Sequence, residues 1–477
     1  MDAVTVRPGI SGAVIAGNTF SGFVPATRAR RITVVGQPLQ RCRLLRRTRD
    51  SRSAPSQLQD IRFVRCPYLN GGSNMTVQDI VAGTPVKELD SAERTRLISA
   101  AQALRPLLES KADEHEARGE LSTEVIEALE SAGLLKLAAP KRIGGLAQPS
   151  GVMAEVAAEL AKGCPSTSWV YTIYNSCLWF ASKLPEVLQA KIFANGIPRI
   201  CSPQNGMGQL VPEGDGFRLT GRWSYATGSH HAAFTMVPAM NAEQELVLVV
   251  MPMSAVRIEN TWLVTGMKGS GSDTVVAEDV QVAASDICPF IEISTTPPTA
   301  IAVGDLEATD YWVNYPLLRA KSLGVLVGCA EGLLESIVAK SSGPIIYSTY
   351  AHKSDSSAYH YLLGEAAVKI RAARHLVERA CRTVDEIADR AEVMSIADRA
   401  EFRGEGAFVV RTLSEVVDRL MDLAGSSGFG TTGWAQRYWR DYSAAARHVL
   451  FNPQISYETA GRNLLGIEPG IVSPDML

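Results

Sequence analysis

The chain of 477 residues is 46% hydrophobic and 20% charged, and its net charge of −3 gives no reason to expect a nucleic-acid partner. This length suggests roughly two to four domains with ample apolar core, and no apolar run approaches the about 18 residues that a membrane helix needs. The eight cysteines include no CxxC pair. A reducing cytoplasm is therefore expected rather than a zinc site or a secreted disulfide framework.

Charge is unevenly distributed along the chain. Residues 1–66 hold twelve Arg and three Asp but no Lys or Glu, a balance of +9, and the remaining residues carry −12. A transit peptide, a basic arm for an acidic surface, and an untranslated stretch before a true start at Met75 are three interpretations of this region. Residues 1–74 are therefore expected to be an extension that is disordered or mis-started, and no function is assigned to them.

Residues 75–195 have the pattern of a helical domain. Apolar residues recur at helical spacing among charged ones, Ser122 is a capping candidate, and Gly133 is a suitable C-terminal cap. Helices are expected at 88–118, 122–132, 152–162 and 169–184.

The period of the apolar residues changes after residue 196. Alternating segments predict a β domain over 196–295, and long helical segments with short connections favour an antiparallel bundle over 296–477. Strands are expected at 217–225, 233–240, 245–253 and 274–282, and helices at 313–342, 359–391, 396–425 and 434–451. The predicted fold class is mainly α with a central β domain.

Three stretches, in this order, resemble the acyl-CoA dehydrogenase superfamily. The first, at 131–145, is SAGLLKLAAPKRIGG. The second runs from GRWSYATGSHHA at 221–232 to TGMKGSGSDTVVAEDVQV at 265–282. The third, at 423–448, is LAGSSGFGTTGWAQRYWRDYSAAARH. The resemblance implies an N-terminal helical domain, a middle β-barrel that binds flavin and a C-terminal four-helix bundle.

Within this superfamily the chain resembles the two-component (group D) flavin-dependent monooxygenases. Many dehydrogenases carry a catalytic carboxylate eight residues after an Arg-Asp pair, whereas here Val449 stands eight residues after Asp441, beside His448. The monooxygenase branch places a histidine on this helix and an aromatic-x-Ser/Thr-Gly motif where this chain has residues 225–228, Tyr-Ala-Thr-Gly. The chain is similar in this respect to the oxygenase components of 4-hydroxyphenylacetate and secosteroid phenol hydroxylases and to indole oxygenases.

The resemblance implies an enzyme that uses reduced FMN or FAD and O2, through a flavin hydroperoxide, to hydroxylate an aromatic (phenolic or indolic) small molecule. His448 is the candidate base, because histidine titrates near neutral pH. A hydroxyl that supports the oxygen adduct is assigned to Thr227, with Ser229 as the second candidate. Alternatively, Thr227 belongs to a plain strand-end turn and His448 is a capping or core residue.

Further residues are assigned by resemblance to the flavin and the substrate. The flavin would be held by Trp223, Tyr225, Thr227, His231, Lys268, Ser270, Ser272, Gly425, Ser426, Ser427 and Arg440, and the substrate by Trp169, Tyr174 and Cys177, with Tyr171 and Trp179 nearby. A hairpin connection, a helix-to-helix turn and plain core packing are the alternatives for these segments. His115, His352, His360 and His375 are expected on the surface, and no histidine pair with ligand spacing indicates a metal.

No GxGxxG opens a nicotinamide-binding βαβ unit, so a separate reductase is expected to supply reduced flavin by diffusion. Residues 343–359 contain no Arg where relatives bring one to the flavin, which leaves FMN and FAD both open. A homotetramer is implied by the resemblance. The alternatives are an FAD-dependent acyl-CoA dehydrogenase, an N- or S-oxygenase of the same fold, and a non-catalytic protein that binds a ligand or partner.

Overall fold

The computed structural model describes residues 3–4, 15–16, 91–299, 301–473 and 476–477. The chain divides into two units, Met1–Val86 and Lys87–Leu477. In the first unit, β1 (Ala3–Val4) pairs antiparallel with β2 (Ile15–Ala16). Apart from these four residues, the expected extension 1–74 lies outside the described part of the chain.

Between residues 91 and 192 the secondary-structure elements are all helices, as predicted. Ser122 accepts a hydrogen bond from the N–H of Val125 and begins a helix, and Gly133 follows its end with φ of +74°. A short helix over 186–192 was not predicted. The elements are α2 (Ser91–Arg118), α3 (Thr123–Ser131), α4 (Ser150–Gly163), α5 (Pro165–Ala181) and α6 (Glu186–Ile192).

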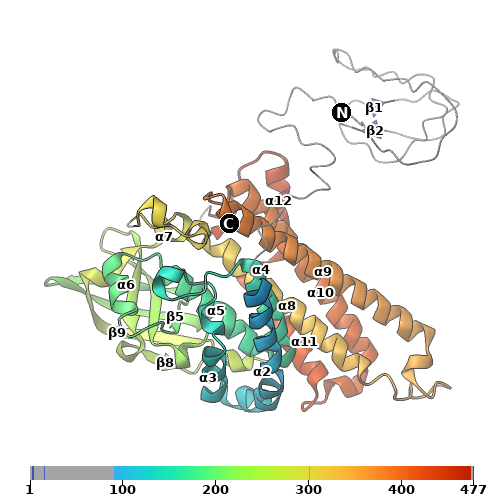
Figure 1. The fold of residues 1–477 in the computed structure, drawn as a ribbon. Coiled ribbons are helices and arrows are strands. Elements are labelled where there is room, and N and C mark those ends of the chain that lie inside the picture. The colour runs from blue at the N-terminus through green and yellow to red at the C-terminus, as the bar shows by residue number, and fades with distance from the viewer. Residues whose placement is uncertain (1–2, 5–14, 17–90, 300, 474–475) are drawn as a thin grey trace. The chain divides into compact units, whose positions relative to one another are not determined.

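The following strands form one eight-stranded sheet in the order β10-β7-β6-β4-β5-β9-β8, with β3 paired to β6. The long strands β4, β5 and β9 are adjacent and antiparallel. Figure 1 shows this sheet on one side of the second unit, with α4 and α5 between it and the C-terminal helices. The strands are β3 (Ile200–Cys201), β4 (Asn205–Glu213), β5 (Gly216–Ala226), β6 (Phe234–Met240), β7 (Leu246–Pro252), β8 (Arg257–Glu259), β9 (Asp273–Ala283) and β10 (Ile287–Pro289).

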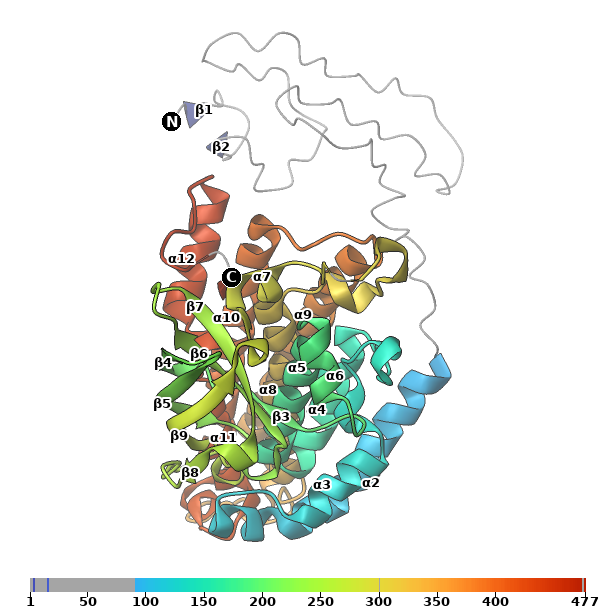
Figure 2. The same cartoon turned by 90° about the vertical axis from the view of Figure 1, so that its left-hand side faces the viewer.

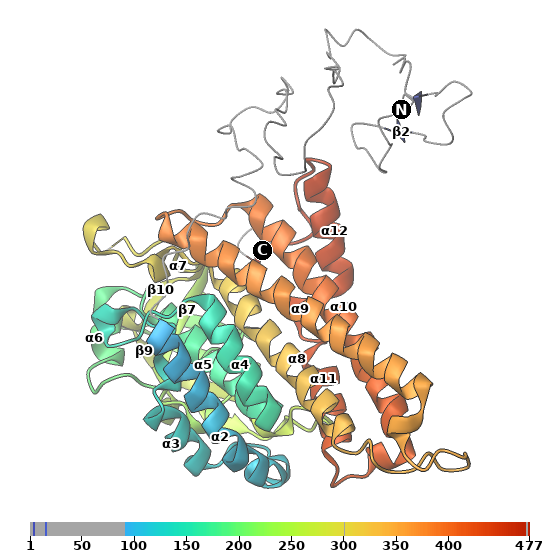
Figure 3. The same cartoon turned by 45° about the vertical axis from the view of Figure 1, so that its right-hand side comes forward.

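Long helices return after the sheet. Helices α8, α9 and α10 run alongside one another, with α11 and α12 packed on α8 and α10 (Figure 3). The helix expected over 434–451 is shorter than predicted, because α11 ends at Ala445 and a tight turn follows. The domain boundaries near 195 and 295 stay predictions. The helices are α7 (Phe290–Thr295), α8 (Asn314–Val338), α9 (Ser357–Asp389), α10 (Ile396–Ala424), α11 (Trp434–Ala445) and α12 (Pro453–Leu464).

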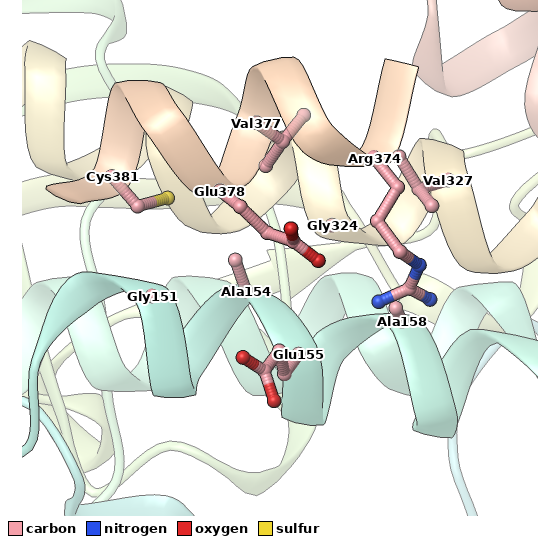
Figure 4. Close-up of a pocket in the computed structure, with 10 residues that line it drawn as sticks. All are labelled: Gly151, Ala154, Glu155, Ala158, Gly324, Val327, Arg374, Val377, Glu378 and Cys381. Carbon is pink, nitrogen blue, oxygen red and sulfur yellow. The ribbon is translucent and has the colours of Figure 1, made fainter. Parts of the chain in front are cut away.

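Small residues let α4 and α8 approach one another closely. A Cβ atom added to Gly324 would lie 2.2 Å from the carbonyl oxygen of Ala154, and one added to Gly328 would lie 2.1 Å from that of Ala158. Beside this crossing, α9 leaves a pocket with about 260 Å³ of empty volume. Figure 4 shows Arg374 projecting from α9 over this pocket, above the small residues of α4.

We expect Gly324→Ala to lower the free energy of unfolding by about 1–3 kcal/mol, because the new methyl group forces two helices apart. The matched control is Gly364→Ala on α9, where an added Cβ meets nothing within 4 Å. That change removes glycine's backbone entropy cost and is expected to be neutral or stabilising by up to about 1 kcal/mol. Urea unfolding of both variants measures the two changes in the free energy of unfolding. Equal stability for the two variants would contradict the close-packed crossing.

Candidate active site

Three buried hydroxyls meet where β5 ends and β9 begins. Thr227 Oγ1 lies 2.8 Å from Ser272 Oγ, which lies 2.8 Å from Ser270 Oγ. Each residue is less than 10% exposed. Gly228, with φ of +73°, allows the chain to turn directly after Thr227. We call Thr227, Ser270 and Ser272 the hydroxyl cluster; its members were predicted from separate motifs.

The loop before β9 is held against the end of β5 by backbone contacts. Gly228 N–H donates to the carbonyl of Ser270 at 3.0 Å, and Ser229 Oγ donates to that of Gly271 at 3.4 Å. Lys268 begins a single turn that ends at Gly271, whose φ of +53° suits glycine. The expected Gly/Ser loop therefore forms and lies beside the Thr-Gly turn.

Helix α11 fixes the same loop from the other side. Asp441 Oδ1 accepts the N–H of Met267 at 2.5 Å, and burial raises the pKa of Asp441 to about 7. Arg440 donates to Glu116 at 3.0 Å and to the carbonyl of Thr265. Through these contacts Arg440 positions the loop, and its role in binding the flavin stays a prediction.

The side chains of the two histidines after the turn also form hydrogen bonds with other protein groups. His230 Nε2 lies 2.7 Å from Asp273 Oδ2, and Asp273 Oδ1 accepts the N–H of Trp262 at 2.8 Å. His231 Nε2 lies 2.7 Å from the carbonyl oxygen of Leu121 and therefore donates to it. His231 thus joins the β domain to the N-terminal helices, and its place beside the flavin stays a prediction.

The aromatic surface of the site differs from the prediction. Trp223 is 0% exposed in the core of the sheet and donates Nε1–H to the carbonyl of Pro238. It is therefore unavailable for stacking on a flavin. Tyr225, with φ of +63°, is 57% exposed instead, and its ring meets Trp262 edge-on at 5.7 Å. Trp262 was not predicted as a site residue. Its position six residues before the predicted Lys268 was the signal that could have identified it.

His448 lies beyond the end of α11 and not on the expected helix. Its Nδ1 accepts the N–H of Leu450 at 3.3 Å, and its ring meets Trp169 of α5 edge-on at 5.2 Å. Burial lowers the pKa of His448 to about 4. The ring is thus neutral at pH 7 and carries its proton on Nε2. In this arrangement Nε2–H is the donor that His448 can offer to a ligand, and its role as a base stays a prediction.

The aromatic residues of α5 divide into two groups. Tyr174 donates its hydroxyl to the carbonyl of Gly228 at 2.6 Å and is 1% exposed, so it supports the Thr-Gly turn from behind. Tyr171 and Trp179 are fully buried and hydrogen-bonded to backbone carbonyls. Trp169 and Cys177 each keep 6% of their surface exposed. These two remain the candidates for contact with a substrate.

The Gly/Ser segment 425–430 packs elsewhere, against the end of α8 and the connection to α9. Ser427 and Gly428 line a pocket with about 300 Å³ of empty volume, together with Lys340 and Lys353. The two lysines supply positive charge where the sequence lacks the expected arginine. Lys340 was not predicted, because a lysine just after an apolar helix looks like an ordinary surface residue.

Among the histidines expected on the surface, His352, His360 and His375 are exposed. His115 is 1% exposed and lies 3.2 Å from Ser122 Oγ. Burial lowers its pKa to about 4. The expectation for His115 was wrong because its charged sequence neighbours point to other faces of α2.

The donors in this region suit a flavin. The hydroxyl cluster holds donors of the kind that the nitrogen and oxygen atoms of a flavin ring accept, and Trp262 with Tyr225 offers an aromatic surface. Lys340, Lys353 and Ser427 suit a phosphate. The residues present therefore fit a flavin ring at one place and an anion at the other.

Comparisons with known proteins agree with this architecture. Models of the acyl-CoA dehydrogenase N-terminal and C-terminal domains match residues 93–183 and 322–453. The FADH2-dependent resorcinol hydroxylase oxygenase component of Rhizobium sp. (strain MTP-10005) is 27% identical, over 78% of this chain and 95% of its own. The flavin-dependent monooxygenase oxygenase subunit HsaA of Mycobacterium tuberculosis is 26% identical, over 78% and 96%.

Among solved structures, XiaF from Streptomyces sp. in complex with FADH2 and glycerol superposes with a TM-score of 0.76 at 28% identity, covering 80% of this chain and 98% of its own. The chain thus has the acyl-CoA dehydrogenase fold, and its homologues are oxygenase components of two-component flavin-dependent monooxygenases. The predicted resemblance and fold class are confirmed. No helix in the described part of the chain is long and apolar enough to cross a membrane.

Proposed function

We propose that the chain is the oxygenase component of a two-component monooxygenase that hydroxylates a phenolic or indolic small molecule with reduced FMN or FAD and O2. The observation that carries the proposal is the hydroxyl cluster. Beside it, Tyr174 of α5 donates to the carbonyl of Gly228, and Trp169 of the same helix contacts His448. The names of the homologues support the same reaction class.

The chain's own residues bind and orient the reactants. Bound reduced flavin would supply the two electrons that activate O2, and O2 would supply the transferred oxygen atom. Thr227 donates a hydrogen bond beside the flavin ring, and Ser270 and Ser272 fix its hydroxyl. His448 donates from Nε2 to the oxygen of a substrate that binds as its phenolate, and this hydrogen bond stabilises the ionised, more nucleophilic ring. Trp169 and Cys177 form the apolar wall that excludes water.

The remaining parts of the proposal concern assembly. A separate reductase delivers reduced flavin by diffusion to a cytoplasmic homotetramer. In that assembly, the segment 425–430 with Lys340 and Lys353 binds the phosphate of a flavin held mainly by a neighbouring subunit. Support comes from the positive charge of this pocket and from its position away from the hydroxyl cluster.

Stopped-flow absorbance tests the proposal without any aromatic substrate. Purified protein is mixed with reduced FMN, or reduced FAD, and oxygenated buffer. We expect a long-lived absorbance band distinct from those of reduced and oxidised flavin, and the flavin that gives the longer lifetime is the preferred one. Immediate appearance of oxidised flavin with both cofactors, as in free solution, would reject the proposal.

A further inference from the structure

One buried carboxylate holds a segment that has no regular secondary structure. Asp273 is the first residue of β9, and its Oδ1 accepts the backbone N–H groups of Thr261 and Trp262 at 2.7 and 2.8 Å. Residues 260–264 follow β8, the edge strand that lies beside β9 in Figure 2, and belong to no helix or strand. These two N–H groups are thus bound by a side chain instead of a neighbouring strand.

The same carboxylate contacts a histidine that follows the Thr-Gly turn. Asp273 Oδ2 lies 2.7 Å from His230 Nε2, and His230 Nδ1 lies 3.3 Å from an oxygen of Glu120, two residues beyond the end of α2. A Cβ atom added to Gly271 would lie 3.1 Å from His230 Cδ2, so the histidine ring also packs on the loop before β9. Groups from separate segments therefore fix the position of Asp273.

The indole ring of Trp262 is fixed by contacts of its own. Its Nε1–H donates to the carbonyl of Met267 at 2.9 Å, and its ring meets that of Tyr225 at an interplanar angle of 80°. Tyr225 has a positive φ, which is an unusual conformation for a bulky residue, and this conformation presents its ring to solvent. The pair of rings is therefore within reach of a ligand, whereas Trp223 is not.

We propose that Asp273 is a positioning residue that holds Trp262 beside Tyr225 as one wall of the flavin site. Asp273 directly follows Ser272, so the chain that supplies a member of the hydroxyl cluster also anchors the two rings. Removing the carboxylate releases the N–H groups of Thr261 and Trp262 and lets the indole leave its place. This inference rests on the proposed function, because it takes the two rings as part of a flavin site.

The first test follows Trp262 without any flavin. Full-length protein labelled with 5-fluorotryptophan gives a fluorine NMR signal for each of its seven tryptophans, and Trp262→Phe identifies the signal of Trp262. We expect Asp273→Ala to shift and broaden that signal, because the segment loses its anchor. The signal of Trp312, which packs against Trp179, is expected to stay in place.

The second test adds reduced FMN, or reduced FAD, to the labelled protein under anaerobic conditions. We expect the bound flavin to shift the Trp262 signal of the wild type. Asp273→Ala is expected to weaken flavin binding about two- to tenfold, which is the size of an aromatic contact. Asp273→Asn keeps an oxygen that can accept the two N–H groups, so it is expected to retain most of the wild-type affinity and signal position.

The matched control is Asp385→Ala. The carboxylate of Asp385 also accepts two consecutive backbone N–H groups, those of Ser150 and Gly151 at the start of α4, but Asp385 lies on α9 outside the candidate site. We expect this variant to leave the Trp262 signal and the flavin affinity unchanged, whatever its effect on stability. A change equal to that of Asp273→Ala would assign the effect to a general loss of stability and contradict the positioning role.

Two further outcomes overturn the inference. One is a Trp262 signal that Asp273→Ala leaves in place. The other is a wild-type Trp262 signal that neither flavin moves at concentrations that give the persistent stopped-flow band, a result that would leave the proposed function standing. This second outcome is measured on the wild type, so it decides the inference even if Asp273→Ala does not fold. Absence of binding by both flavins, with immediate oxidation in the stopped-flow experiment, would reject the proposed function as well.

Discussion

Replacing Thr227 with valine, which has the same shape without the hydroxyl, is expected to lower the fraction of consumed O2 that appears as hydroxylated product about tenfold. Thr227 Oγ1 is buried and hydrogen-bonded to Ser272, and when Ser272 is the donor of that bond the O–H of Thr227 is held as a donor for a ligand. A hydrogen bond to a group that gains charge contributes about 1.5–3 kcal/mol, and 1.4 kcal/mol corresponds to a tenfold change. The consumed O2 that no longer appears in hydroxylated product is expected to appear as hydrogen peroxide. Oxygen uptake, product and peroxide measured on the same samples give the fraction directly.

Thr227→Ser is the matched control, because it keeps the hydroxyl and removes only a methyl group. We expect it to retain most of the wild-type product fraction. Equal losses in the valine and serine variants would show that packing at this position matters rather than the donor. Ser229→Ala should have a smaller effect, since Ser229 already donates to the carbonyl of Gly271.

His448→Ala is expected to lower kcat/KM for a phenolic substrate about 10–100-fold, and His448→Gln is expected to recover a substantial part of the loss. The N–H of Leu450 occupies Nδ1, which leaves Nε2–H as the functional donor. The side-chain amide of glutamine places an N–H close to that position. A glutamine variant no better than the alanine variant would instead assign His448 the role of a base.

The pH dependence provides a second measurement on His448. Burial lowers the pKa of His448 from its ordinary value near 6.5 to about 4, so the ring stays neutral as pH falls from 9 to 6. The difference in kcat/KM between wild type and His448→Gln should therefore be constant over this range. A divergence centred near pH 6.5 would show that the ring titrates as an exposed histidine.

Much of the fold was predictable because local patterns and tertiary structure agree. Alternating residues in β5 and β9 formed paired strands, and Ser122 and Gly133 bounded α3 as expected. The Thr-Gly turn and the Lys268–Ser272 loop were found as separate motifs. Their convergence into one hydroxyl cluster depends on a pairing over about 40 residues, which no local pattern specifies.

The errors have identifiable physical causes. Strand alternation would place Trp223 and Tyr225 on one face, but an irregular register between Trp223 and Ala226 turns Tyr225 outward and leaves Trp223 in the core. One continuous helix was expected over 434–451, yet α11 stops at Ala445. His115 looked exposed among charged neighbours, although its spacing from Leu108 and Ala112 places it on the buried stripe of α2.

The contacts of α11 have a consequence for how a cofactor enters and leaves. Arg437 and Arg440 both donate to Glu116 of α2, and Asp441 receives the N–H of Met267 from the loop before β9. Segments from the beginning, middle and end of the second unit are thus joined at one point, where Arg437 is 3% exposed. Opening the unit as hinged halves would break buried charged hydrogen bonds all at once. Under the proposed function, in which reduced flavin arrives by diffusion, we therefore expect flavin to enter and leave through local rearrangement of side chains such as Tyr225 and Trp262, with the framework held rigid.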